Sequence, residues 1–228
     1  MATKTMEVVK GLDVQRYMGR WYEIASFPSR FQPKNGENTR ATYTLNEDGT
    51  VNVLNETWTN GSRGFIQGTA YKADPSSDEA KLKVKFYVPP FLPIIPITGD
   101  YWVLYIDDDY QYALIGQPSR NYLWILSRKP HLDEEIYNML LQRATDEEYD
   151  VSKLHKTPQS ASPPEDAPVD TKGIWWIKSV FGNVTISSAR SSVYHGSQEG
   201  NFNTRRYYSR GNRSEAADDI HRAVQMRL

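Results

Sequence analysis

The sequence predicts an all-β fold: an eight-stranded up-and-down antiparallel barrel with one C-terminal helix packed outside, plus a disordered C-terminal extension. Three observations support the barrel and its helix. Short strand-like segments recur at near-regular spacing, turn residues separate them, and an amphipathic helical pattern follows the last one. Eight strands joined by hairpins favour a closed barrel because closure leaves no exposed sheet edge.

The predicted elements follow one another along residues 6–156. A short helical turn is expected around residues 13–17, with Asp13 as its N-cap. Turn signals such as Asn60-Gly61-Ser62 and Asp107-Asp108-Asp109 separate the strands. The predicted strands are 21–27, 39–45, 51–58, 65–72, 80–87, 100–106, 111–116 and 122–127.

Two segments indicate how the barrel wall is arranged. Residues 81–86 alternate strictly, which places Leu82, Val84 and Phe86 inside and three lysines in water. Residues 101–106 are apolar on both faces, so the outer face needs a cover. We expect the amphipathic helix predicted over residues 133–144, with acids in its first turn, to supply that cover. Its contact face is predicted to hold Ile136, Met139, Leu140 and Arg143.

Composition excludes several classes of protein and site. The 228-residue chain has a net charge of -1 and a mean hydropathy of -0.66, which gives no bias toward nucleic acid. There is no cysteine, so disulfides, thiolate metal sites and a thiol nucleophile are excluded. Residues 1–10 lack the apolar stretch of a signal peptide, and no run approaches the roughly 18 apolar residues of a membrane span. We therefore expect a cytoplasmic protein with no signal peptide.

The chain after residue 156 is a different kind of sequence. Residues 157–173 are rich in proline, serine and acids, and they predict a linker without secondary structure. Residues 174–182 form a tryptophan-rich segment. Residues 184–228 carry seven arginines and four acidic residues. We expect the tail 183–228 to be disordered.

Three motifs carry a family resemblance. Gly19-Arg20-Trp21-Tyr22, Asp107-Asp108-Asp109-Tyr110 and the run 122–128 resemble the three signature regions of the lipocalins. The match is closest to the branch that contains apolipoprotein D, the bacterial outer-membrane lipocalin and the plant temperature-induced lipocalins, and it extends over residues 6–182. This resemblance implies a ligand-binding barrel with a helix packed on its outside.

The resemblance also implies a structural cluster that closes one end of the barrel. Gly19 lets a bulky neighbour lie close to the backbone, and Trp21 plugs the barrel floor. Arg128 looks like the family arginine that stacks on this tryptophan, a cation–π contact of roughly 1 kcal/mol.

Four residues are candidates for binding a ligand inside the barrel, since a small eight-stranded barrel can enclose one apolar ligand. By resemblance, Tyr43, Asn55 and Trp124 look like the pocket-lining residues of apolipoprotein D. Alternation alone adds Trp102. Ordinary barrel packing is the alternative interpretation of each.

A proline-rich apolar run over residues 88–97 is the most distinctive local feature. Its prolines forbid a regular helix or a central strand. An apolar loop at the end of a strand predicts insertion into a membrane surface, which stabilises binding by about 1–2 kcal/mol per inserted side chain. The alternative is a lid over the cavity mouth. The predicted membrane contacts are Pro89, Pro90, Phe91, Leu92, Pro93, Ile94 and Ile95, with Trp175 and Trp176 as a second interfacial contact.

The sequence predicts no catalytic residue, no metal site and no cofactor. The Asp107–Asp109 run fits a solvated hairpin tip better than a cation site. Glu23 shares the face of Trp21, and a buried carboxyl there needs a hydrogen-bonding partner or a raised pKa. The histidines lie at element ends or in the tail, where none can serve a nucleophile inside the barrel: His131, His155, His195 and His221.

These features together predict a non-enzymatic protein that binds a small hydrophobic ligand, a lipid or a fatty-acid-like molecule. We expect a monomer or weak homodimer, attached peripherally to the plasma membrane and without a nucleic-acid partner. The resemblance implies a role in heat, cold and oxidative-stress tolerance by protecting membrane lipids. Two alternatives are a tetrapyrrole or pigment carrier, and an enzyme on the same barrel that acts on oxidised lipid.

Overall fold

The computed structural model describes residues 4–28, 35–88, 95–160 and 165–169. The predicted linker 157–173 is therefore described only in part. Residues 89–94 of the predicted membrane loop, the tryptophan-rich segment 174–182 and the predicted disordered tail 183–228 lie outside the described residues.

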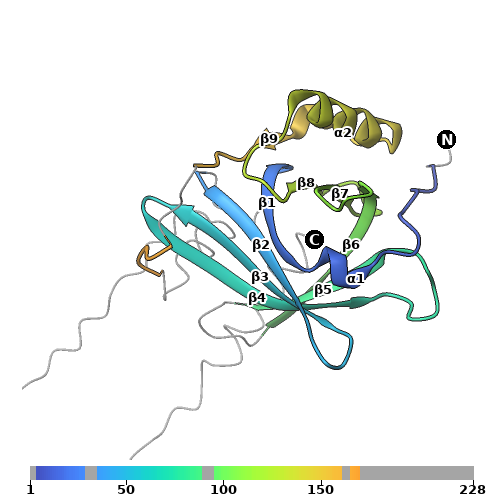
Figure 1. Cartoon of the computed structure of the whole chain (residues 1–228), viewed down its shortest axis with the longest axis horizontal. Coiled ribbons are helices and arrows are strands. Elements are labelled where there is room, and N and C mark those ends of the chain that lie inside the picture. Colours follow the sequence, from blue (N-terminus) through green and yellow to red (C-terminus); the bar gives the residue numbers. More distant parts are fainter. Residues whose placement is uncertain (1–3, 29–34, 89–94, 161–164, 170–228) are drawn as a thin grey trace, which may run out of the picture. The chain divides into compact units, whose positions relative to one another are not determined.

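Within the described part of the chain, eight antiparallel strands close into a barrel and one helix lies against its outside (Figure 1). The elements are α1 (Val14–Tyr17), β1 (Gly19–Ser26), β2 (Glu37–Leu45), β3 (Val51–Thr59), β4 (Ser62–Lys72), β5 (Lys81–Val88), β6 (Ile95–Ile106), β7 (Tyr112–Gly116), β8 (Leu123–Ser127), α2 (Glu134–Asp146), η1 (Val151–Lys153) and β9 (His155–Lys156). Each strand from β2 to β7 pairs with the next one along the chain, and β1 pairs with both β8 and β2. The predicted up-and-down barrel with its outer helix is confirmed.

Tight turns set the strand register. Asn60 and Gly61 join β3 to β4, and both have positive φ, 52° and 77°. This is the conformation of a two-residue type I′ hairpin, which asparagine followed by glycine favours. Between β6 and β7, one oxygen of Asp107 accepts hydrogen bonds from the backbone N–H groups of Gln111 (2.6 Å) and Tyr112 (2.8 Å). Asp107 therefore caps a hairpin turn.

Strand β6 begins earlier than the predicted residue 100. At the start of β6, Ile95 pairs with Val88 of β5 and Pro96 pairs with Tyr87 of β5. The prediction that the prolines exclude this segment from a strand was wrong for residues 95–97. Proline is tolerated here because it lies near the first residue of the strand.

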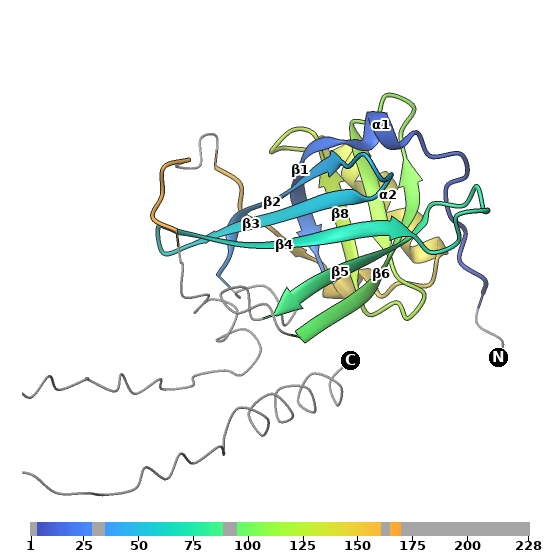
Figure 2. The same cartoon turned by 90° about the horizontal axis from the view of Figure 1, so that it is seen from below.

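Helix α2 covers the outer side of the barrel wall (Figure 2). Leu140 of the helix is fully buried in one apolar cluster with Leu114 of β7 and Ile125 of β8. The guanidinium of Arg143 lies 3.9 Å from the ring centroid of Tyr105 on β6. The amphipathic pattern over 133–144 therefore marks a helix that packs its apolar face on the barrel.

The wall is split between β1 and β2, and a later segment fills the split. These strands pair only over the first half of β1, and β9 pairs with β1 further along. The side-chain amide of Gln159 donates to the carbonyl of Glu23 on β1 (2.8 Å) and to that of Thr39 on β2 (2.9 Å). We call residues 155–160 and 165–169 the strap, because they join two strands that do not join each other at this end.

The second half of the strap is anchored to the outer face of β2 and β4. Arg40, only 2% exposed, donates from both terminal nitrogens to Glu165 (2.7 and 2.8 Å) and from Nε to Glu56 (2.8 Å). The backbone N–H of Arg63 donates to the carbonyl of Pro168 (2.9 Å). The described part of the predicted linker therefore has almost no regular secondary structure after β9, yet it is fixed to the barrel.

Candidate ligand-binding site

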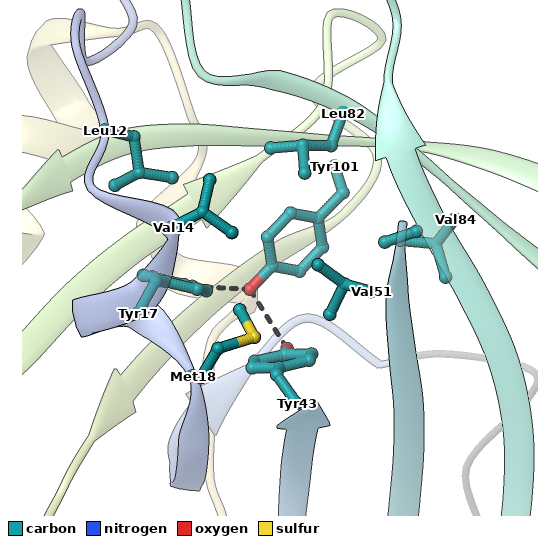
Figure 3. Close-up of a pocket in the computed structure, with 10 residues that line it drawn as sticks. Leu12, Val14, Tyr17, Met18, Tyr43, Val51, Leu82, Val84 and Tyr101 are labelled. Carbon is teal, nitrogen blue, oxygen red and sulfur yellow. Dashed lines mark hydrogen bonds between the residues drawn. The ribbon is translucent and has the colours of Figure 1, made fainter. Parts of the chain in front are cut away.

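An apolar cavity lies inside the barrel near α1 (Figure 3). We call this the α1 end and the opposite end, which the strap bridges, the strap end. The cavity volume is about 30 Å³, room for one or two water molecules, so a larger ligand reaches it only if side chains move. The lining residues come from the N-terminal segment and five strands: Leu12, Val14, Tyr17, Met18, Tyr43, Val51, Ala70, Leu82, Val84 and Tyr101.

Three tyrosines meet at this cavity, and we call them the tyrosine triad. The hydroxyl of Tyr101 lies 2.6 Å from that of Tyr17 and 3.0 Å from that of Tyr43 (Figure 3). The rings of Tyr17 and Tyr43 are stacked with centroids 5.6 Å apart, and Tyr101 meets Tyr43 edge to face at 6.2 Å. Such offset and edge-to-face pairs are favourable for aromatic rings. The triad therefore gives an otherwise apolar cavity its polar groups.

All three phenols stay protonated at neutral pH. Burial raises the pKa of Tyr17 and of Tyr101 well above the ordinary value. Burial also raises the pKa of Tyr43 to about 12, and the carboxylate of Glu23 adds to this increase to a lesser extent. The cavity therefore presents neutral hydroxyl groups.

Trp21 and the residues around it lie at the α1 end. The Trp21 side chain is fully buried, and its indole N–H donates to the carbonyl of Tyr17 (2.8 Å). The guanidinium of Arg128 lies 3.9 Å from the ring centroid of Trp21. Gly19 has φ +94°, and a Cβ added there would lie 3.3 Å from Nη1 of Arg128. Gly19, Trp21 and Arg128 therefore lie together at this end, and their closing role stays a prediction.

Three of the four predicted ligand-binding residues, those on β2, β3 and β8, are spread along the interior. Tyr43 lines the cavity. Trp124 packs against the interior apolar cluster, with its ring stacked on Tyr122 at 5.8 Å. Asn55 is half-buried on β3, two residues beyond Val53 and thus on the same face of the strand. Asn55 and Trp124 do not line the described cavity.

Trp102 requires a correction. It packs into the outer cluster under α2, and the ammonium of Lys81 lies 4.7 Å from its ring centroid. Its neighbour Tyr101 points into the cavity instead. Both faces of β6 are apolar because one faces the interior and the other faces α2, so alternation could not tell the two residues apart.

Tyr17, Met18 and Tyr101 were missed as cavity residues. Tyr17 and Met18 come from the short α1 turn and the residue after it, which the sequence marks only as a helical turn. The apolar run 101–106 that suggested Trp102 also contains Tyr101. Assigning the opposite face of this strand to the interior would have selected Tyr101.

Glu23 is buried, and its carboxylate accepts hydrogen bonds from the hydroxyls of Ser26 (3.0 Å) and Thr157 (2.6 Å). Thr157 belongs to the strap, and its backbone N–H donates to the carbonyl of Ile24 (2.9 Å). Glu23 therefore helps to attach the strap to β1, which is the structural use of a buried carboxylate.

Comparison with known proteins places this geometry in a family. A family model described as a lipocalin-like domain matches residues 12–159. The chain is also 77% identical over 181 residues to temperature-induced lipocalin-1 of Arabidopsis thaliana, a match that covers 78% of this chain and 97% of the relative. The chain belongs to the lipocalin family. The resemblance seen in the signature motifs is thereby confirmed.

Two further comparisons agree with this assignment. The lipocalin chain is 41% identical over 155 residues to the outer membrane lipoprotein Blc of Citrobacter freundii, covering 66% of this chain and 81% of the relative. The structure of insecticyanin from the tobacco hornworm Manduca sexta superposes with a TM-score of 0.60 at 21% identity, covering 74% of this chain and 92% of that one. At that identity the superposition shows the common fold.

Two features of the described residues bear on other kinds of site. No group of three or more histidine, aspartate or glutamate residues in the described ranges could hold a metal ion. Among the helices of that part of the chain, none has the length and apolar character needed to cross a membrane.

Proposed function

We propose that this lipocalin binds and sequesters a small hydrophobic ligand, a lipid or a fatty-acid-like molecule, without catalysing a reaction on it. The observation that carries the proposal is the apolar cavity at the α1 end of a closed eight-stranded barrel. Barrels of this size hold one small ligand, and apolar pockets with a few convergent polar groups bind apolar molecules. The hydroxyls of the tyrosine triad are the polar groups of this cavity.

The described residues favour binding over catalysis. His131 and His155 are exposed, away from the cavity lining. Glu23 is hydrogen-bonded to Ser26 and to Thr157 of the strap, a structural use. The rival proposal, an enzyme that acts on oxidised lipid, requires turnover of a lipid peroxide that is lost in Glu23→Gln.

We further propose that the protein is cytoplasmic and attaches peripherally to the plasma membrane through residues 89–95, with Trp175 and Trp176 as a second contact. Strand β5 ends and β6 begins at the strap end, where the side chain of Tyr87 is 43% exposed. The ammonium of Lys85 lies 5.1 Å from the Tyr87 ring centroid. Tyrosine and lysine are typical of the headgroup region of a membrane, which supports contact on this side.

The proposed physiological role is tolerance of heat, cold and oxidative stress by protecting membrane lipids. Its support is the 77% identity to a relative named temperature-induced lipocalin-1. A barrel that holds free or oxidised lipid next to a bilayer gives this role a physical basis, because sequestration removes the lipid from the membrane.

The experiment that tests ligand binding is native mass spectrometry, followed by organic extraction, of the protein purified from its own tissue. We expect a bound fatty acid or oxidised lipid that is released by the solvent. A tetrapyrrole, also visible as absorbance of the purified protein, would favour the pigment-carrier alternative. A barrel that is empty in every preparation would contradict sequestration.

A further inference from the structure

The tyrosine triad has more hydrogen-bond donors than it uses. Each phenol carries one proton, and the three phenols make two hydrogen bonds to one another. Two protons fill these bonds whichever oxygens donate, so one proton remains. Among the described residues, no other acceptor forms a hydrogen bond with any of the three hydroxyls. Tyr17 and Tyr43 are more than nine-tenths buried, and all three line the cavity, so the remaining proton is available inside it.

A buried donor without an acceptor is unfavourable, which makes the remaining proton a binding group. Leaving such a donor unpaired costs about 1–3 kcal/mol. A ligand oxygen that reaches the cavity can accept this proton. An apolar chain end in the same place cannot, so the triad discriminates between ligands by what they carry at the inserted end.

The cavity offers no cation to balance a charged ligand. None of its ten described lining residues is charged. Arg128 is the nearby cation, but it lies on Trp21 and donates to the backbone carbonyls of Arg16 (2.7 Å), Arg20 (2.9 Å) and Tyr110 (3.2 Å). A carboxylate would therefore lose its hydration in exchange for one phenol hydrogen bond, with no ion pair.

We propose that the tyrosine triad receives the polar end of the ligand, and that this end is an uncharged oxygen acceptor, such as a ketone, an ester carbonyl or a hydroxyl. The inference rests on the proposed function of the cavity and specifies its ligand class. A fatty acid then binds with its carboxylate away from the triad. Met18 lines the cavity beside Tyr43 (Figure 3), and its flexible thioether side chain is suited to move aside for the ligand.

The test compares three probes that share a chain length and differ at one end: dodecan-2-one, dodecane and dodecanoate. Each displaces the fluorescent dye N-phenyl-1-naphthylamine from the full-length protein. We expect the ketone to bind about five to ten times more tightly than the alkane, which is the effect of one net hydrogen bond. With ¹³C at the carbonyl, the infrared stretch of the bound ketone shifts to lower frequency than in hexane.

Variants must remove all three hydroxyls, because a single substitution does not remove the donor. After Tyr43→Phe, two phenols make one hydrogen bond and one proton still remains. The triple variant Tyr17→Phe, Tyr43→Phe, Tyr101→Phe keeps the rings and leaves no buried donor unpaired, so we expect it to fold. In this variant the ketone loses its advantage over the alkane and the infrared shift disappears. Tyr71→Phe, on the outer face of β4, is the matched control and leaves both unchanged.

The outcomes separate this inference from the proposed function. If the alkane displaces the dye as well as the ketone does, or if dodecanoate shows the largest gain, the inference is overturned while hydrophobic binding stands. If the dye or every probe fails to bind, both are overturned. The probe series on the unsubstituted protein decides the inference even if the triple variant does not fold.

Discussion

At the α1 end the buried centre is an apolar ring, Trp21, whereas at the strap end it is a charged side chain, Arg40. The ring of Trp21 lies 5.0 Å from the ring of Tyr17 and 3.9 Å from the guanidinium of Arg128. Arg40 lies over the ring of Trp58 at 4.7 Å and is held by two carboxylates, of which Glu165 is 59% exposed. One end is therefore stabilised mainly by burial of apolar area. The other is stabilised by a buried ion pair to Glu56 and by an ion pair to Glu165 that water can reach.

Because of this difference, we expect the two ends to open at different free energies. Apolar burial at the α1 end is lost only when the barrel itself unfolds. The strap is attached by side-chain hydrogen bonds and by a partly exposed ion pair, and such contacts open locally at lower free energy than a core does. We therefore expect the α1 end around the tyrosine triad to be rigid, and the strap between β1 and β2 to detach locally.

Trp21→Ala is expected to have the largest effect on stability. Removing a fully buried tryptophan costs about 3–5 kcal/mol in the free energy of unfolding, and Arg128 also loses its cation–π partner. The measurement is urea unfolding, where the midpoint falls with little change in slope. Trp102→Ala is the matched control at the half-buried tryptophan under α2, with a cost of about half as much. Equal losses in the two variants would contradict a special role for the floor.

The next effect concerns membrane attachment at the strap end. Phe91→Asp with Ile94→Asp removes two apolar side chains from the bilayer, at about 1–2 kcal/mol each. Binding to phosphatidylcholine liposomes, measured by sedimentation, therefore weakens more than tenfold, while unfolding in urea is unchanged.

Gln15→Asp with Gln111→Asp is the control for the added charge. Both side chains are exposed at the α1 end, and this variant keeps its liposome binding. If the Phe91 and Ile94 double variant still sediments with the liposomes, the loop is not the anchor.

The sequence predicts the barrel more fully than the site because the two depend on different kinds of information. Alternation along 81–86 places Leu82 and Val84 inside, where they line the cavity. A strand with one solvent-exposed face shows this alternation in its own sequence. On β6 both faces are covered, and the same pattern selected Trp102 where Tyr101 lines the cavity.

The strap shows a second limit of local patterns. Residues 157–173 have the composition of a free linker, and their anchor, Arg40, lies 125 residues before Glu165. Nothing near Arg40 in the sequence marks it as buried, because an arginine between Thr39 and Ala41 fits a solvent-facing strand position. Its burial is decided by the strap, a tertiary contact that no local propensity encodes.

The smallest expected effect is the contribution of Glu165 to holding the strap. The hydrogen bonds and positive charge of Arg40 lower the pKa of Glu165 from 4.5 to about 2. Because the pKa is lower in the attached state than in the released state, the carboxylate stabilises attachment above about pH 4.5, and this contribution is lost as the pH falls toward 2. Glu165 is largely exposed, so solvent screening limits the contribution to about 1 kcal/mol or less.

Hydrogen exchange measures this contribution where the strap touches the barrel. The amides of Arg63 and Thr157 donate to Pro168 and Ile24, so their exchange reports strap opening. We expect Glu165→Gln to raise the exchange of both amides up to about fivefold at pH 6, with the difference from the unsubstituted protein shrinking below pH 4.5 and vanishing as the pH approaches 2. Asp150→Asn removes another exposed carboxyl of lowered pKa, one bonded to Ser152 rather than to Arg40, and leaves both amides unchanged. A pH-independent difference would show that Glu165 holds the strap by packing rather than by charge.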